Sequence, residues 1–195
     1  MSLQLRCRCG KLQGEVDTAR VAARAVCYCK DCQAFARFLK AQDTVLDASG
    51  GTEVEAALPA AVRFTSGLEH LACMSLSPKG IYRWYASCCH TPIGNTPRNP
   101  GMSYVGLVRT CLDATLEALE RDLGRVRMVA NTGSAYGPAK PAPLGSVLAV
   151  AKIGTMLVKA RLGGGWRDNP FFDASGAPVR TPRVLTLEER SALAR

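Results

Sequence analysis

The sequence predicts a mainly β protein with helical additions toward its C-terminal end. Short runs of alternating apolar residues, broken by Gly and Pro, fill residues 1–112; examples are TEVEAALPAAVRFTSG and GIYRWYAS. Helical periodicity appears only after that point. With 195 residues, 47% of them hydrophobic and 21% charged, the chain can bury a real core, so neither a disordered chain nor a disulfide miniprotein fits. We expect a β domain at residues 1–112 and an extension at residues 113–195 with two helices packed on it.

The first expected helix follows the β domain directly. Asp113 is a candidate N-cap, and Gly124 stands where a C-terminal glycine cap belongs. One face of this helix carries Leu112, Leu116, Leu119 and Leu123. A short amphipathic helix that lies on the β domain is therefore predicted.

The second expected helix covers Ser146–Leu162, with Ser146 as its cap and the glycine run 163–165 as its stop. Lys152, Thr155 and Lys159 form one narrow polar stripe, and apolar residues cover most of the remaining surface. We expect this helix to be largely buried, against the β domain or a partner. Its length and charges make it too short and too charged for a membrane span, and a position flat on a membrane surface is the less favoured alternative to burial.

Irregular segments flank the second helix. The Gly- and Pro-rich run ANTGSAYGPAKPAP predicts a loop or linker before it. After it, the tail NPFFDASGAPVRTPRVLTLEER is punctuated by proline and is expected to wrap the surface. Trp166, Phe171 and Phe172 are predicted to anchor that tail.

The charge distribution and the lack of targeting signals limit which partners and which cellular compartment the sequence favours. The net charge is +9, and the excess sits at the two ends: residues 1–40 hold eight Lys and Arg against three Asp and Glu, and residues 150–195 hold eight against four. No basic block or recognition-helix motif is present, which disfavours a nucleic-acid partner. We find no apolar stretch of spanning length and no secretory leader, so we expect a cytoplasmic protein with no membrane association. Thiols stay reduced there, and nine cysteines predict metal or thiol chemistry rather than disulfides.

Seven cysteines fall into three tight clusters whose spacing is typical of zinc ligands. These are Cys7 with Cys9, then Cys27 with Cys29 and Cys32, and finally Cys88 with Cys89. No cluster has the four ligands of a closed site, so clusters must combine in space. The other two, Cys73 and Cys111, lie in apolar stretches and are predicted to be buried core thiols.

The three-cysteine cluster is the candidate for chemistry. A zinc ion with three protein ligands keeps an open position for water or a substrate thiolate. One alternative is a closed structural site whose fourth ligand is His70, His90 or Cys73. Another is a redox pair of Cys29 and Cys32, although a thioredoxin-like βαβ context is absent.

The motif order RCRCG, VCYCKDC and WYASCCHTPIGN resembles the glutathione-dependent formaldehyde-activating enzyme family, which includes centromere protein V. The resemblance covers about residues 5–110. It implies a coiled, mostly antiparallel β-sheet zinc fold with two zinc sites. Cys7 and Cys9 would join the late cysteines in a structural site, and Cys27, Cys29 and Cys32 would form the site associated with activity.

Three positions differ from the family's pattern. Ala86 stands where the late motif has its first cysteine, so Cys88 is the substitute ligand, and two adjacent ligands demand a bent backbone. His90 replaces the usual glycine and is itself a candidate ligand. Tyr28 stands where the family commonly has His, which removes a proton-transfer group.

The resemblance implies carbon–sulfur lyase activity or related thiol-adduct chemistry, with a glutathione-like small thiol as partner. Basic residues near the clusters are candidates for binding its carboxylates: Arg6, Arg8, Lys30 and Arg83. The alternative is a non-catalytic zinc module for protein or nucleic-acid interaction, with the second helix or the basic ends as its contact surface.

Overall fold

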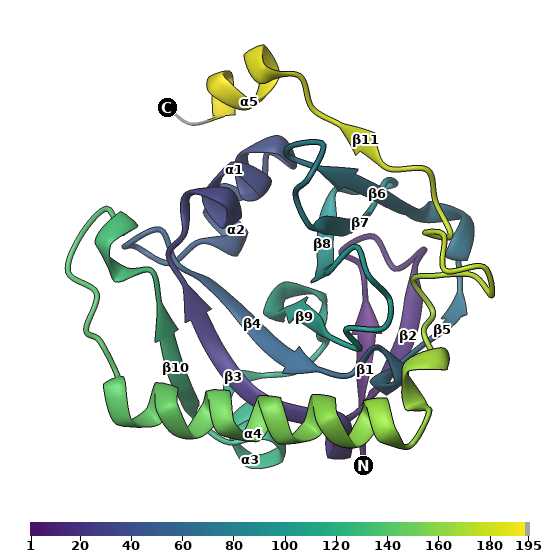
Figure 1. Ribbon diagram of the computed structural model, residues 1–195. Coiled ribbons are helices and arrows are strands. Elements are labelled where there is room, and N and C mark those ends of the chain that lie inside the picture. The colour runs from purple at the N-terminus through teal and green to yellow at the C-terminus, as the bar shows by residue number, and fades with distance from the viewer. Residues whose placement is uncertain (194–195) are drawn as a thin grey trace.

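A computed structural model describes residues 1–193 and shows a mainly β fold with helices toward the C-terminus (Figure 1). The strands are β1 (Ser2–Arg6), β2 (Gln13–Asp17), β3 (Val21–Cys27), β4 (Thr52–Ala57), β5 (Val62–Ser66), β6 (Leu71–Ser75), β7 (Tyr82–Ala86), β8 (Thr91–Thr96), β9 (Val105–Val108), β10 (Val126–Ala130) and β11 (Arg183–Val184). The helices are α1 (Lys30–Phe38), α2 (Gln42–Val45), α3 (Leu116–Leu123), α4 (Pro143–Leu162) and α5 (Leu187–Leu193). The prediction of a mainly β protein with C-terminal helices is confirmed, but α1 and α2 lie within residues 1–112, where no helix was expected.

The strands form two sheets. A small sheet has the order β1-β2-β5, and a larger one has the order β10-β3-β4-β9-β8-β7-β6-β11. Neighbouring strands are antiparallel throughout, except at the two edges of the larger sheet, where β10 lies parallel to β3 and β11 parallel to β6. The segment after residue 112 therefore supplies both edge strands of the larger sheet as well as helices.

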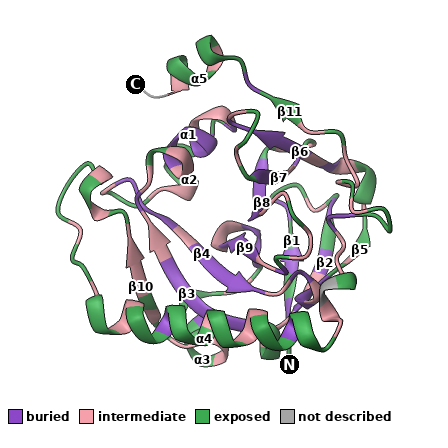
Figure 2. Ribbon diagram, in the orientation of Figure 1, coloured by how far each residue is buried: buried purple, intermediate pink, exposed green. Residues whose placement is uncertain are grey.

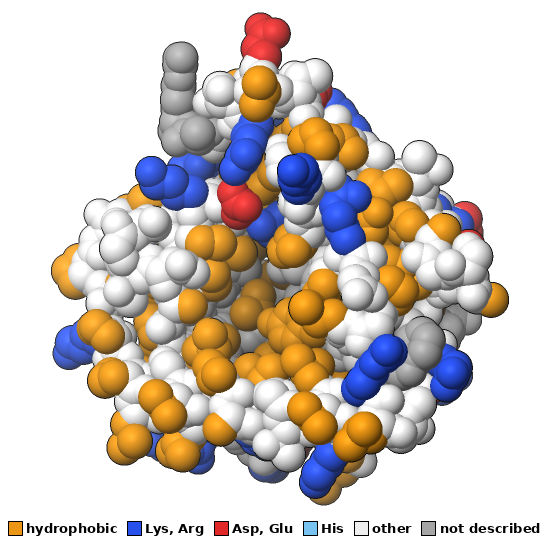
Figure 3. All heavy atoms as spheres, viewed as in Figure 1, with side chains coloured by type: hydrophobic (Ala, Val, Ile, Leu, Met, Phe, Trp, Pro, Cys, Tyr) orange, Lys and Arg blue, Asp and Glu red, His pale blue; other side chains and the backbone are white. Residues whose placement is uncertain are grey.

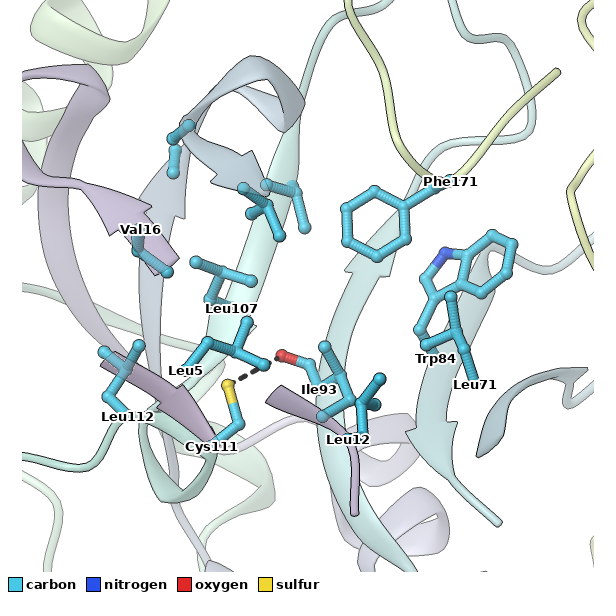
Figure 4. Packing of buried hydrophobic residues seen from close by; sticks show 14 of the residues in the cluster. Leu5, Leu12, Val16, Leu71, Trp84, Ile93, Leu107, Cys111, Leu112 and Phe171 are labelled. Atoms are coloured by element: carbon cyan, nitrogen blue, oxygen red, sulfur yellow. Dashed lines mark hydrogen bonds between the residues drawn. The ribbon is translucent and has the colours of Figure 1, made fainter. Parts of the chain in front are cut away.

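The main core lies between the two sheets (Figure 4). Trp84 is fully buried, and its ring centroid lies 5.1 Å from that of Phe171 in the C-terminal tail. Phe172 is also buried, so both phenylalanines anchor the tail as predicted; the side chain of Trp166 lies outside the described part of the chain. Cys73 and Cys111 are buried core thiols, which confirms that prediction, and Cys111 donates to the carbonyl of Ile93.

The first predicted helix is shorter than its sequence pattern indicates. α3 is capped by Thr115, whose hydroxyl accepts a hydrogen bond from the Ala118 amide at 3.2 Å, and not by Asp113. Leu112 precedes the helix and instead forms a β-bridge with Leu5. The predicted C-terminal glycine is confirmed, since Gly124 follows the helix with a positive φ of 81°.

A buried ion cluster lies where β3 and β4 meet the end of α3. Arg24 pairs with Glu53 and donates to the Gly124 carbonyl at 2.8 Å. Its Nε atom lies 3.5 Å from the carboxylate of Glu55, which is fully buried. Within residues 1–193 neither oxygen of Glu55 has a hydrogen-bond partner, and burial raises the pKa of this carboxyl to about 8.

α4 differs most from its prediction. It begins at Pro143 rather than at a Ser146 cap, because Ser146 lies inside the helix and its hydroxyl accepts a hydrogen bond from the Val129 amide. Only Ala149 and Ala160 of the helix are buried, so the prediction of a helix buried against the β domain is wrong (Figure 2). The expectation that length and charge exclude a membrane span is not met. By length and composition this 20-residue helix qualifies as a candidate, with only 11% of its apolar window buried.

Candidate metal centres

Two of the three cysteine clusters come together at one point. Cys7 and Cys9 lie in the turn after β1, in the small sheet, while Cys88 and Cys89 lie in the turn between β7 and β8, in the larger sheet. All four sulfurs lie within 4.8 Å of one another. This group, the four-cysteine cluster, therefore links the two sheets.

The sulfur separations in the four-cysteine cluster match a tetrahedral metal site. Cys7 Sγ lies 3.6 Å from Cys9 Sγ and 3.8 Å from Cys88 Sγ, and the last two sulfurs lie 3.3 Å apart. Cys88 Sγ lies 3.9 Å from Cys89 Sγ. A zinc–sulfur bond of about 2.3 Å gives tetrahedron edges of about 3.8 Å, so these four donors fit a closed zinc site.

A tight turn lets the adjacent Cys88 and Cys89 reach the same point. The amide of His90 donates to the carbonyl of Ala86 at 2.8 Å, which closes the turn between the two strands. His90 ends it in the left-handed region, with a φ of 57°. In a turn successive side chains need not point to opposite faces as they do in a strand, and this supplies the expected bend.

Hydrogen bonds from Arg8 hold the two turns of the four-cysteine cluster together. Its amide donates to Thr91 Oγ1, and its guanidinium donates to the carbonyl of Cys89, both at 3.0 Å. Burial raises the pKa of Cys89, but hydrogen bonds from Thr91 and from Cys9 and Cys7 outweigh that effect and bring it to about 6. Burial, with hydrogen bonds to Cys9 and Cys7, raises the pKa of the neighbouring Cys88, so the turn favours the thiolate, the form that binds metal, at Cys89.

The remaining cluster, the three-cysteine cluster, sits at the junction of β3 and α1. Cys27 ends the strand, Cys29 is the N-cap of the helix and Cys32 lies in its first turn; their sulfurs all lie within 4.8 Å of one another. The sulfur of Cys29 accepts the Cys32 amide at 3.4 Å, as an N-cap side chain does. A helix N-terminus also attracts negative charge, which favours thiolates here.

The charge of the three-cysteine cluster is concentrated on Cys27. Hydrogen bonds from Cys29 and then Cys32 lower the pKa of Cys27 to about 2, and the amide of Asn131 adds a donor 3.3 Å from its sulfur. Burial, and after it the Coulomb interactions with Cys27 and Cys32, raises the pKa of Tyr104 to about 12. Tyr104 therefore keeps its phenolic proton beside the sulfurs.

The candidate fourth ligands lie elsewhere. Within residues 1–193 the three-cysteine cluster gathers no further Cys, His, Asp or Glu. Cys73 is buried in the main core, and the imidazole of His70 lies 3.7 Å from Glu69. His90 is exposed beside the other cluster but outside its ligand group. The three sulfurs thus leave one position of a tetrahedron to a ligand from outside this set.

The basic residues named from the sequence divide between the two clusters. Arg6 pairs with Asp113 at 3.5 Å, next to Arg8 and the four-cysteine cluster. Arg83 is buried and donates to Asn95 at 3.0 Å. Hydrogen bonds to Cys27 and Cys29, together with burial, raise the pKa of Cys32, and the charge of Arg83 offsets only part of that rise. Lys30 is exposed at the start of α1.

Asn131, Gln33 and Tyr104 surround the three-cysteine cluster and were not found from the sequence. Gln33 donates to the carbonyls of Tyr28 and Ser134, which holds the Gly- and Pro-rich loop against α1. Asn131 has a left-handed φ of 59°, which turns the chain from β10 into that loop. The only sequence feature that singles out Asn131 is its place before a Gly-rich loop. That feature predicts a turn, not a hydrogen bond to a cysteine.

Comparison with known proteins gives one family. Residues 1–181 match a family described as a family of unknown function, DUF6151. No curated protein matches the chain. A crystal structure of a Rhodobacter sphaeroides protein, a structural genomics target, is similar at 20% identity and a TM-score of 0.43, over 66% of this chain and 99% of that one. The match over nearly the whole length shows that the chain belongs to the DUF6151 family.

Proposed function

We propose that the protein is a two-site zinc protein. The four-cysteine cluster holds a structural ion, and the three-cysteine cluster holds an ion whose fourth position takes a small thiol such as glutathione. The observation that carries the proposal is the contrast between the two groups: one has four sulfurs at tetrahedral spacing, while the other has three and no fourth protein donor within residues 1–193.

In this proposal the metal ion of the structural site cross-links the two sheets. Its ligands come from the turn after β1 and from the turn between β7 and β8, which belong to different sheets. Soft thiolate ligands select zinc over the hard divalent cations. Binding there fixes the two sheets relative to each other, and the free energy of metal binding becomes folding free energy.

The three-cysteine site is proposed to serve carbon–sulfur chemistry of the formaldehyde-activating type. A zinc ion bound there would lower the pKa of a thiol in its fourth position. In the proposed reaction the thiolate sulfur forms a bond to the carbon of formaldehyde, the π electrons of the C=O bond move to oxygen, and that oxygen takes a proton. The product is an S-hydroxymethyl thioether.

The chain's own residues would orient these groups. The N-terminus of α1 and the Asn131 amide stabilise negative charge on the sulfurs, and Tyr104 offers a phenolic proton as a hydrogen-bond donor. Exposed Lys30 provides a positive charge for a substrate carboxylate. These residues supply positioning and charge for a thiol peptide.

The orientation of Tyr28 favours the second candidate function, a non-catalytic zinc module. Its hydroxyl donates to Asp47 at 2.9 Å, and the residue is buried. It therefore offers no group for proton transfer at the position where the formaldehyde-activating enzymes commonly have His. In this alternative the three-cysteine site is only structural and does not exchange its fourth ligand.

Titration of the cobalt-substituted protein with glutathione separates the two functions. Cobalt bands report a change from water to thiolate at an open site, whereas a four-thiolate site has no vacancy and gives no response. We expect glutathione to shift the visible spectrum and Cys29→Ser to abolish the shift. S-methylglutathione, which lacks a free thiol, is the matched control and should have no effect. An unchanged spectrum at millimolar glutathione would overturn the open-site proposal and support the structural module.

A further inference from the structure

The outward side of α4 is a continuous apolar surface. Leu144, Val147, Val158 and Leu162 are 74%, 66%, 59% and 84% exposed. Successive members of this set are three, eleven and four residues apart, so all four lie on one side of the helix. Exposed Ala151 lies between them on the same side. In Figure 3 hydrophobic side chains gather along the lower part of the molecule, over α4. We call these five residues the apolar stripe.

The helix is fixed in this orientation by its inner side. Ala149 and Ala160 are buried, α4 packs on β3 and β10, and Ser146 accepts the Val129 amide at 3.4 Å. Turning the apolar stripe inward would break these contacts. The fold therefore presents this stripe to its surroundings, and an exposed apolar surface of this length marks an interaction site.

The charge around the apolar stripe indicates what it contacts. Residues 123–167 contain seven Lys and Arg and no Asp or Glu, although the chain as a whole has sixteen acidic residues. Lys152 and Lys159 are exposed on α4, and Arg125 and Arg127 are exposed on and beside β10. Arg125 lies 3.8 Å from the carboxylate of Glu120, but every charged residue of α4 itself is positive. A long aliphatic face with only positive charges on its own helix complements a surface that is apolar below and anionic above.

We propose that α4 docks in the plane of an anionic lipid bilayer. The apolar stripe enters the boundary between headgroups and acyl chains, and the flanking lysines reach the lipid phosphates and carboxylates. Packing on β3 and β10 keeps the helix on the protein, so it lies on the membrane rather than crossing it. A second copy of the chain fits the apolar stripe less well, because two basic faces would repel each other. Nucleic acid complements the charge but not the aliphatic side chains.

Flotation with lipid vesicles tests this proposal. The full chain should bind vesicles of equimolar phosphatidylcholine and phosphatidylserine, and its partition coefficient should fall at least about tenfold on phosphatidylcholine alone or in high salt. Val147→Asp combined with Val158→Asp should abolish binding. Both positions are exposed, so the unfolding midpoint should not change.

A matched control places two carboxylates elsewhere. Ile81→Asp combined with Leu187→Asp changes two exposed apolar residues outside α4 and should leave vesicle binding unchanged. Equal binding to neutral and anionic vesicles would overturn the proposal, as would binding retained in the Val147, Val158 variant. A chain that ignores vesicles but sediments as a dimer, and becomes monomeric in that variant, would show instead that the stripe joins two copies.

Discussion

Cys9→Ala should lower the free energy of unfolding by at least about 3 kcal/mol, even though the Cys9 side chain is exposed. Truncating an exposed side chain with no special partner usually changes stability by no more than about 0.5 kcal/mol. Cys9, however, lies with Cys7, Cys88 and Cys89 at tetrahedral spacing. Loss of one thiolate breaks a link between the two sheets, and metal binding to such sites is worth on the order of 10 kcal/mol.

Urea unfolding of the parent and of Cys9→Ala measures this effect, with metal content determined on the same samples. Removal of metal by a strong chelator provides the control, because the two proteins should then unfold at nearly the same urea concentration. Equal midpoints and equal metal content before chelation would contradict the assignment of Cys9 as a ligand.

Glu55→Gln should make stability less dependent on pH between about pH 5 and pH 8. Burial raises the pKa of Glu55 in the folded protein from its ordinary 4.5 to about 8, so within that window the folded state holds a proton that the unfolded chain has released. The stabilisation that comes from the protonated Glu55 is complete below the ordinary pKa of 4.5 and is lost as the pH rises toward the folded-state pKa of about 8. The free energy of unfolding of the parent should therefore fall by up to about 1.4 kcal/mol per pH unit relative to the variant.

Denaturation of both proteins across this pH range checks the prediction. Cysteine titration affects parent and variant equally, so the difference between them isolates Glu55. Arg24 keeps its pairing with Glu53 in the variant, which leaves the buried guanidinium compensated. Parallel stability curves would mean that Glu55 is ionised in the folded protein and that its burial is offset by Arg24.

The sequence predicted the fold class and the grouping of cysteines because both depend on local pattern. Alternation and turn residues indicate strands without knowledge of their partners, and short cysteine spacings keep ligands together. The joining of Cys7 and Cys9 with Cys88 and Cys89 spans 79 residues or more between the two turns. Only the family resemblance suggested it, since no spacing rule does.

Other features depend on contacts that local pattern does not carry. The periodicity of α4 shows that it is apolar, but not whether protein, partner or lipid covers Leu144 and Val158. The edge strand β11 is only two residues long and pairs with β6 far along the chain, so its own sequence gives no strand signal. Asn131 meets Cys27 only because its loop folds over α1. Tertiary packing decides each of these.

Native mass spectrometry of the freshly reduced, folded chain tests the central claim most directly, since it counts bound metal ions on each molecule. We expect a mass that exceeds that of the metal-free chain by two zinc ions, one for each of the two cysteine clusters. A folded chain that carries no metal would contradict the claim.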